Sequence, residues 1–206
     1  MDEPVIENGA AKVSAGEWLV PPDQPVAAFG TVTLRGQKGL FVRDRALVRV
    51  ATIPGAAWCA SAERPFLTVL SALPDVSLNL VSAKLLVASV PARVGAKALK
   101  LVPMSLRKPT VITEFRKGLV VAATRSRVTR VTVGADETLS VRPEALVAWI
   151  GARPTGSCPK LTVLDLVLPR GPKNLAYSFH GPATVWFEGA ALPRVMKGIR
   201  PYGVSA

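Results

Sequence analysis

The residues best able to do acid–base or nucleophilic chemistry are few in this chain. Its one histidine, His180, follows Ser178 by two positions, which on a β-strand places both side chains on the same side. A nucleophilic triad also needs an acid brought in by the fold, and the chain has no G-x-S-x-G turn to present the serine. Asp136 and Glu137 are adjacent in a predicted turn, so their carboxylates diverge and are expected to form hydrogen bonds within the turn. No glycine-rich phosphate-binding motif occurs. The sequence therefore predicts a protein that is not an enzyme, with no catalytic, cofactor-binding or metal-binding residues.

The two cysteines do not form a recognisable metal site. Cys59 and Cys158 are too few for a four-ligand zinc site. We interpret them as apolar thiols in a reducing compartment, with a disulfide between them as the alternative.

Positive charge is the strongest polar signal. The net charge is +12, and residues 1–23 hold five acids against Lys12, so the remainder has 25 basic and 9 acidic residues. Such an excess favours an acidic partner: a protein surface, anionic lipid headgroups or nucleic acid. Nucleic acid is the less favoured of these, because Phe115 is the only aromatic residue in the basic clusters. The candidate contacts are Lys97, Lys100, Arg107, Lys108, Arg116, Lys117, Arg125, Arg127, Arg130, Arg194, Lys197 and Arg200.

An internal sequence repeat predicts the structural units that hold these residues in place. Val32–Val50 aligns with Val131–Trp149 without a gap, and eight of nineteen positions are identical. The motif P-x-L-T-V-L occurs at Pro65–Leu70 and again at Pro159–Leu164, and an Asn-Leu pair follows each copy. The matches keep their order, and their offset drifts only from 99 to 94 to 95. We interpret this as duplication of a unit of just under one hundred residues that buries an apolar face against its copy.

Short runs of Val, Leu, Ile and Thr between prolines and glycines predict strands throughout. Strands are expected at 29–34, 39–42, 46–50, 67–70, 76–80, 84–89, 119–123, 128–133, 139–141, 146–150, 161–168, 175–179 and 184–187. Val128 and Val131 have opposite parity, so strict alternation would place one on each face, whereas a bulge near Thr129–Arg130 would turn both inward. The fold class is therefore all-β, an internally duplicated sandwich or barrel-like structure with few or no long helices.

The predicted organisation has five parts. Prolines make the N-terminal segment an extended arm, and six basic residues against Glu114 mark a connector between the repeats. The parts are an arm (1–25), a first β repeat (26–95), a basic connector (96–117), a second β repeat (118–190) and a C-terminal tail (191–206).

The second half resembles a known family. The similarity lies in Gly118–Val121, Ser126–Val141, Leu146–Trp149 and the G-P-x-x-V-W segment Gly181–Trp186. These segments are similar to the altered-inheritance-of-mitochondria family, whose bacterial members share a β fold, a double-stranded β-helix, with the tryptophan RNA-binding attenuation protein. The resemblance implies a non-enzymatic β scaffold that often oligomerises and that in eukaryotes is associated with the mitochondrial inner membrane.

The leading functional expectation is a structural or assembly protein. It would be an accessory subunit of a mitochondrial inner-membrane complex, a respiratory or ATP-synthase assembly, located at the periphery of that membrane. No membrane-spanning segment and no secretory signal is expected. The alternatives are an RNA-binding β module, a bacterial cytoplasmic scaffold and a small-molecule-binding barrel.

Overall fold

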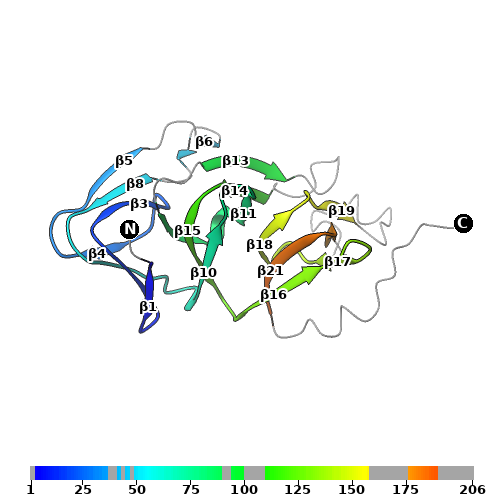
Figure 1. Cartoon of the computed structure of the whole chain (residues 1–206). Helices are drawn as coiled ribbons and strands as arrows, with labels where there is room; N and C mark the ends of the chain where they lie inside the picture. The colour runs from blue at the N-terminus through cyan, green and yellow to red at the C-terminus, as the bar shows by residue number, and fades with distance from the viewer. Residues whose placement is uncertain are drawn as a thin grey trace, which may run out of the picture.

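The computed structural model describes residues 3–36, 41–42, 45–46, 49–89, 94–99, 110–157 and 176–189 (Figure 1). In this part of the chain the regular elements are β-strands, with one 3₁₀ turn at Ser82–Lys84. The all-β prediction is confirmed. The strands are β1 Val5–Glu7, β2 Ala10–Val13, β3 Gly16–Val20, β4 Val26–Ala28, β5 Thr33–Gly36, β6 Phe41–Val42, β7 Arg45–Ala46, β8 Arg49–Ile53, β9 Ala57–Cys59, β10 Phe66–Ala72, β11 Leu78–Val81, β12 Leu85–Ser89, β13 Val94–Leu99, β14 Thr110–Phe115, β15 Gly118–Thr124, β16 Val128–Val133, β17 Thr138–Val141, β18 Leu146–Gly151, β19 Thr155–Ser157, β20 Ala176–His180 and β21 Ala183–Glu188.

Four antiparallel sheets contain almost all of these strands. Sheet I has the order β1-β2-β9-β4, and sheet II has the order β10-β15-β12-β3-β8-β5. Sheet III has the order β13-β14-β11-β18-β21-β16, and sheet IV has the order β17-β20-β19. Among the strands that the structure describes, β6 and β7 pair only with each other. The chain passes repeatedly from one sheet to the next through short turns, as from β8 to β9 and from β18 to β19.

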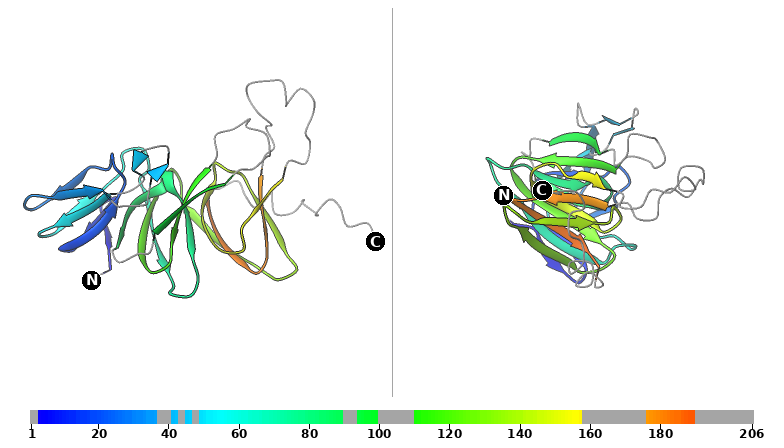
Figure 2. Two further views of the ribbon diagram at one scale, coloured as in Figure 1. Left: turned by 90° about the horizontal axis from the view of Figure 1, so that it is seen from above. Right: turned by 90° about the vertical axis from the view of Figure 1, so that its right-hand side faces the viewer.

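The sheets are stacked face to face with an apolar layer in each of the three spaces between them. Trp18 and Ile53 of sheet II pack with Ala11 and Cys59 of sheet I. Sheets II and III enclose a second layer that includes Phe115, and sheets III and IV enclose a third. Figure 2 shows the sheets following one another along the long axis of the molecule. Sheets II and III are therefore covered on both faces.

This double coverage explains why the strands of the two central sheets are apolar at consecutive positions. On β15, Val120 and Ala122 face sheet III, whereas Val121 and Ala123 face sheet I. Strict alternation holds near Thr129–Arg130, because β16 pairs with β21 in continuous register from Val128 to Val133 without a bulge. Val128 packs against the layer between sheets II and III, and Val131 against the layer between sheets III and IV. Each of them is inward-facing, but on opposite faces of a sheet that has two cores.

The aligned repeat segments form strands in the same order in both halves. They contain β5, β6, β7 and the start of β8 in the first half and β16, β17 and β18 in the second, so β7 has no counterpart strand. The pairing differs, because β5 pairs with β8 whereas β16 pairs with β21. The halves also exchange strands. β15 of the second half lies between β10 and β12 in sheet II, and β11 of the first half lies between β14 and β18 in sheet III.

Two of the predicted parts differ from the structure. The segment predicted as an extended arm contains β1, β2 and β3, and β3 is an interior strand of sheet II. Its prolines Pro21, Pro22 and Pro25 lie between β3 and β4 and separate strands rather than preventing them. The predicted connector contains most of β13 and all of β14, which belong to sheet III. The predicted tail 191–206 and the strand predicted at 161–168 lie outside the described residues.

The turn between β20 and β21 is packed against another turn. Glu137 N donates to Gly134 O (3.1 Å), and Glu137 Oε2 accepts from Gly134 N (2.8 Å), so the predicted turn role of this carboxylate is confirmed. Gly181 N donates to Glu137 O (3.1 Å), and a Cβ on Gly181 would overlap the Gly134 carbonyl oxygen. Only glycine fits this close approach.

Cys59 is expected to be unreactive in the folded protein. Its thiol is free and completely buried between sheets I and II, and burial raises its pKa to about 11. Because the thiolate is the reactive form, an aromatic disulfide reagent should modify Cys59 only after denaturant is added. The measurement uses a Cys158→Ser variant, since Cys158 lies outside the described residues. Rapid labelling of that variant in buffer would contradict this burial.

Candidate functional site

The structure describes about half of the predicted basic contacts. Arg116, Lys117, Arg125, Arg127 and Arg130 are exposed, and Lys97 lies on β13. The other predicted contacts lie outside the described residues: Lys100, Arg107, Lys108, Arg194, Lys197 and Arg200.

The described basic residues form two separate groups. Arg116 and Lys117 occupy the turn before β15, and Arg125 and Arg127 occupy the turn after it. The seven residues of β15 separate these turns by about 20 Å, at about 3.3 Å per residue. Arg116 also has a partner, because its Nε donates to Glu114 Oε1 (3.4 Å). The turn after β15 is therefore the better candidate for a partner's negative charge.

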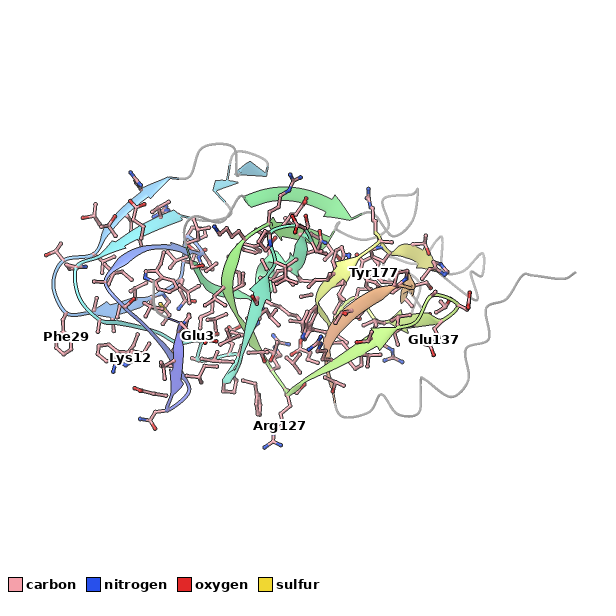
Figure 3. All side chains as sticks on the ribbon, viewed as in Figure 1. Glu3, Lys12, Phe29, Arg127, Glu137 and Tyr177 are labelled. Carbon is pink, nitrogen blue, oxygen red and sulfur yellow. The ribbon has the colours of Figure 1, made fainter. Side chains whose placement is uncertain are left out.

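Two further arginines belong to this second group. Arg130 lies on β16 beside Trp186, with its guanidinium carbon 5.6 Å from the centre of the indole ring. Arg64 precedes β10, whose Phe66 pairs with Thr124, and both Arg64 and Arg125 lie close enough to Lys84 to act on its pKa. We call Arg64, Arg125, Arg127 and Arg130 the arginine surface. Figure 3 shows Arg127 projecting away from the ribbon where β15 leads into β16.

Hydrogen bonds fix the backbone of this turn. Thr124 Oγ1 donates to Ser126 O (2.8 Å) and to Phe66 O (3.1 Å), which ties the turn to β10. Arg125 N donates to Glu188 Oε2 (2.7 Å), which ties it to the end of β21. The side chains of Arg125 and Arg127 are exposed, but the backbone that carries them is held in place. A partner therefore has less backbone conformational entropy to remove when it binds.

Glu188 also belongs to a buried ion pair beneath the turn. Lys84 Nζ bonds to Glu188 Oε1 and donates to Glu144 O (2.9 Å); the side chains of Lys84 and Glu188 are only 8% and 13% exposed. Burial lowers the pKa of the Lys84 ammonium, although Glu188 offsets part of that effect. For Glu188 burial alone would raise the pKa, but Lys84 and the N–H donors of Arg125 and Ser126 hold it below its ordinary value. This pair joins the 3₁₀ turn before β12 to the end of β21 and lies beneath the arginine surface.

His180 lies among hydroxyl groups rather than carboxylates. Its Nδ1 is 3.1 Å from Thr138 Oγ1, and its Nε2 is 3.4 Å from Thr155 Oγ1. The Ser178 hydroxyl is 3.3 Å from that of Ser140. Among the described residues no acid contacts the imidazole, so the contacts orient the ring but do not complete a catalytic triad. The described residues also contain no group of three or more His, Cys, Asp or Glu side chains placed to hold a metal ion.

A cavity of about 250 Å³ opens on sheet III. Glu114, Asn79 and Trp149 are neighbours across β14, β11 and β18, and all three line it. Glu114 is buried and its Oε1 accepts from Ser77 Oγ (2.7 Å), whereas Trp149 Nε1 has no hydrogen-bond partner among the described residues. The remaining lining residues are Ser77, Ile112, Gly151 and Arg153. This cavity is the candidate location for the small-molecule alternative, and composition alone did not indicate it.

Comparison with known proteins supports the fold. The X-ray crystal structure of protein SPYM3_0169 from Streptococcus pyogenes superposes with a TM-score of 0.62 at 13% sequence identity, covering 90% of this chain and 89% of that one. No family model and no curated protein matches the chain. The likeness shows a shared fold. In the described part of the chain, no helix has the length and apolar character required to cross a membrane.

Proposed function

We propose that the protein is a non-catalytic scaffold whose arginine surface binds an acidic protein partner. The supporting observation is the turn itself: Arg125 and Arg127 are exposed on a backbone held by Thr124 and Glu188. The two side chains therefore project from a backbone that is held in place before a partner arrives. An acidic protein surface is favoured over RNA, because the nearby indole of Trp186 is already covered by Arg130.

The partner we propose is another subunit of a larger complex. The resemblance of Ser126–Val141 and Gly181–Trp186 to the altered-inheritance-of-mitochondria family suggests a mitochondrial inner-membrane assembly, with the protein at the membrane periphery. In this proposal the stack of sheets acts as a rigid spacer and the arginine surface as its docking point.

The Arg125→Ala/Arg127→Ala variant is expected to weaken binding to an acidic peptide, such as poly-glutamate, by about 2-fold to about 30-fold. Exposed ion pairs contribute about 0.2–1 kcal/mol each, and two are removed. The measurement is a titration at low and at high salt, and the difference between variants should shrink at high salt because exposed charges are screened. The matched control is Arg49→Ala/Arg142→Ala, which removes two other exposed arginines.

Equal weakening by both double variants would show that net charge, not the arginine surface, drives binding. A titration with single-stranded RNA tests the alternative. If RNA binds more tightly than the peptide, and if Arg125→Ala/Arg127→Ala loses that binding, the partner of the arginine surface is a nucleic acid and not an acidic protein. Co-purification of both double variants from the native host, followed by mass spectrometry, then identifies the partner.

A further inference from the structure

The cavity on sheet III opens on the face of that sheet that packs against sheet IV. Trp149 and Ile112 line it, and both also belong to the apolar layer between these sheets. The indole ring of Trp149 packs against Phe179 of β20, with the ring centres 5.8 Å apart, so sheet IV holds the ring in place. At about 30 Å³ per water, a volume of about 250 Å³ holds about eight waters or one organic molecule of similar size. The cavity therefore suits a ligand with only a few carbon atoms.

The polar side chains on sheet III differ in whether they already have hydrogen-bond partners. Ser77 Oγ donates to Glu114 Oε1 (2.7 Å), and Asn79 Nδ2 donates to Ser77 O (3.3 Å). The Trp149 Nε1–H group is buried and has no acceptor among the described residues. A buried donor without a partner has a cost in free energy, so such a group calls for a bound water or ligand that satisfies it. The unmet need of this cavity is therefore a hydrogen-bond acceptor.

A second donor group lies near this indole. Arg153 follows the end of β18, four residues after Trp149, and it is exposed although it lines the cavity. None of the ion pairs between described residues includes Arg153. An arginine guanidinium binds a carboxylate through two parallel hydrogen bonds, and an indole N–H is a further donor for the same group. The two donors therefore favour a carboxylate near the mouth of the cavity.

The negative charge of Glu114 does not prevent a carboxylate from binding on this side. Glu114 lies on β14, which β11 separates from β18, so the two outer strands are about 10 Å apart. Its Oε1 accepts from Ser77 Oγ and from Arg116 Nε (3.4 Å), and the arginine offsets its charge. A second negative charge on the ligand would lie towards Glu114 and be repelled. The lining therefore favours a monocarboxylate with a short apolar chain over a dicarboxylate.

We infer that this cavity binds a small organic monocarboxylate. The carboxylate accepts hydrogen bonds from Trp149 Nε1 and Arg153, and its short chain lies against Ile112 and beside Gly151, which has no side chain to fill the space. None of these residues belongs to the arginine surface, so the inference does not depend on the proposed docking function.

The indole N–H of Trp149 reports binding directly in an NMR titration of the isotope-labelled full chain. Trp149→Phe identifies its resonance among those of the four tryptophans. The ligands are butyrate, butyramide and butylamine, which match in chain length and differ in charge. We expect butyrate to shift the Trp149 resonance and butylamine to leave it in place. The Trp18 resonance is an internal control, because its Nε1 already donates to Ser14 O (2.9 Å).

Removing the guanidinium tests the second donor. Arg153→Met is expected to weaken butyrate binding at least about tenfold, because hydrogen bonds to a charged group are lost. The matched control is Arg142→Met, which removes an exposed arginine that does not line the cavity and should bind butyrate as the wild type does. Arg125→Ala/Arg127→Ala should also bind butyrate normally, so failure of this inference is distinguishable from failure of the docking proposal.

Three results would overturn the inference. A Trp149 resonance that butyrate leaves in place would show that no carboxylate reaches the indole. Equal binding of butyramide and butyrate would show that the site requires an acceptor but no negative charge. Equal weakening by Arg153→Met and Arg142→Met would show that butyrate responds to the net charge of the protein and not to this cavity.

Discussion

Replacing Glu188 by alanine is expected to lower the free energy of unfolding by about 3–5 kcal/mol. The substitution leaves the Lys84 ammonium, only 8% exposed, without its carboxylate, and it removes the acceptor of Arg125 N. Breaking one side of a buried ion pair has a cost of this order because the remaining charge stays out of water. The measurement is equilibrium unfolding in urea, monitored by tryptophan fluorescence.

Glu137→Ala is the matched control for this result. Glu137 also accepts a backbone N–H bond, from Gly134 (2.8 Å), but it is exposed, so its removal should cost only about 0.5–1.5 kcal/mol. The double variant Lys84→Met/Glu188→Gln should cost less than the sum of the single changes, because it leaves no unpaired buried charge. Equal losses for Glu188→Ala and Glu137→Ala would show that an unpaired Lys84 ammonium at this buried position costs little.

The same pair predicts a pH dependence. The pKa of the Glu188 carboxyl is lower in the folded state than its ordinary value of 4.5. Its stabilisation is therefore complete above the ordinary pKa and is lost as the pH falls through the lower, folded value. The stability difference between wild type and Glu188→Gln should be constant near neutral pH and shrink in acid. A difference that grows in acid would reverse the sign and contradict this assignment.

Separating the two halves of the chain is expected to abolish cooperative unfolding of each half. A cut between Leu99 and Thr110 leaves the first fragment without β15, an interior strand of sheet II, and the second without β11, an interior strand of sheet III. Each fragment then has a gap in the middle of a six-stranded sheet. Co-expression of the two fragments should restore a stable complex, because every missing strand is supplied by the other.

The matched control is the intact chain with a protease site at the same position, cleaved after folding. It should stay associated on gel filtration and unfold in one transition. Cooperative unfolding of the first fragment alone would show that sheet II closes without β15, and the exchange of strands would then have little energetic weight.

The sequence predicted the strands of the second half better than those of the first. The predictions at 128–133 and 146–150 agree with β16 and with all but the last residue of β18. The N-terminal strands were missed because they are only three to five residues long and lie between prolines. β14 was missed because basic residues in the surrounding segment masked its own apolar positions, such as Ile112 and Phe115.

The arginine surface could be predicted only in part. Arg125, Arg127 and Arg130 are close in sequence, but Arg64 joins them through the pairing of β10 with β15, which no local pattern encodes. No sequence pattern separates Arg116 and Lys117 from this group, because the distance between the two groups depends on the length of β15. Glu188 ends the strand Ala-Thr-Val-Trp-Phe-Glu, where an acid suggests a solvent-exposed strand end rather than a buried partner for Lys84.

The exchange of strands between the halves has a consequence during translation. β10 and β12 are synthesised before β15, so sheet II cannot close when the first half leaves the ribosome. At about 5–20 residues per second, the stretch from Ala72 to Thr124 requires several seconds. During that time β10 has no paired strand on either side. Its exposed apolar side chains then make the nascent chain a substrate for chaperones, and a source of aggregation when chaperones are scarce.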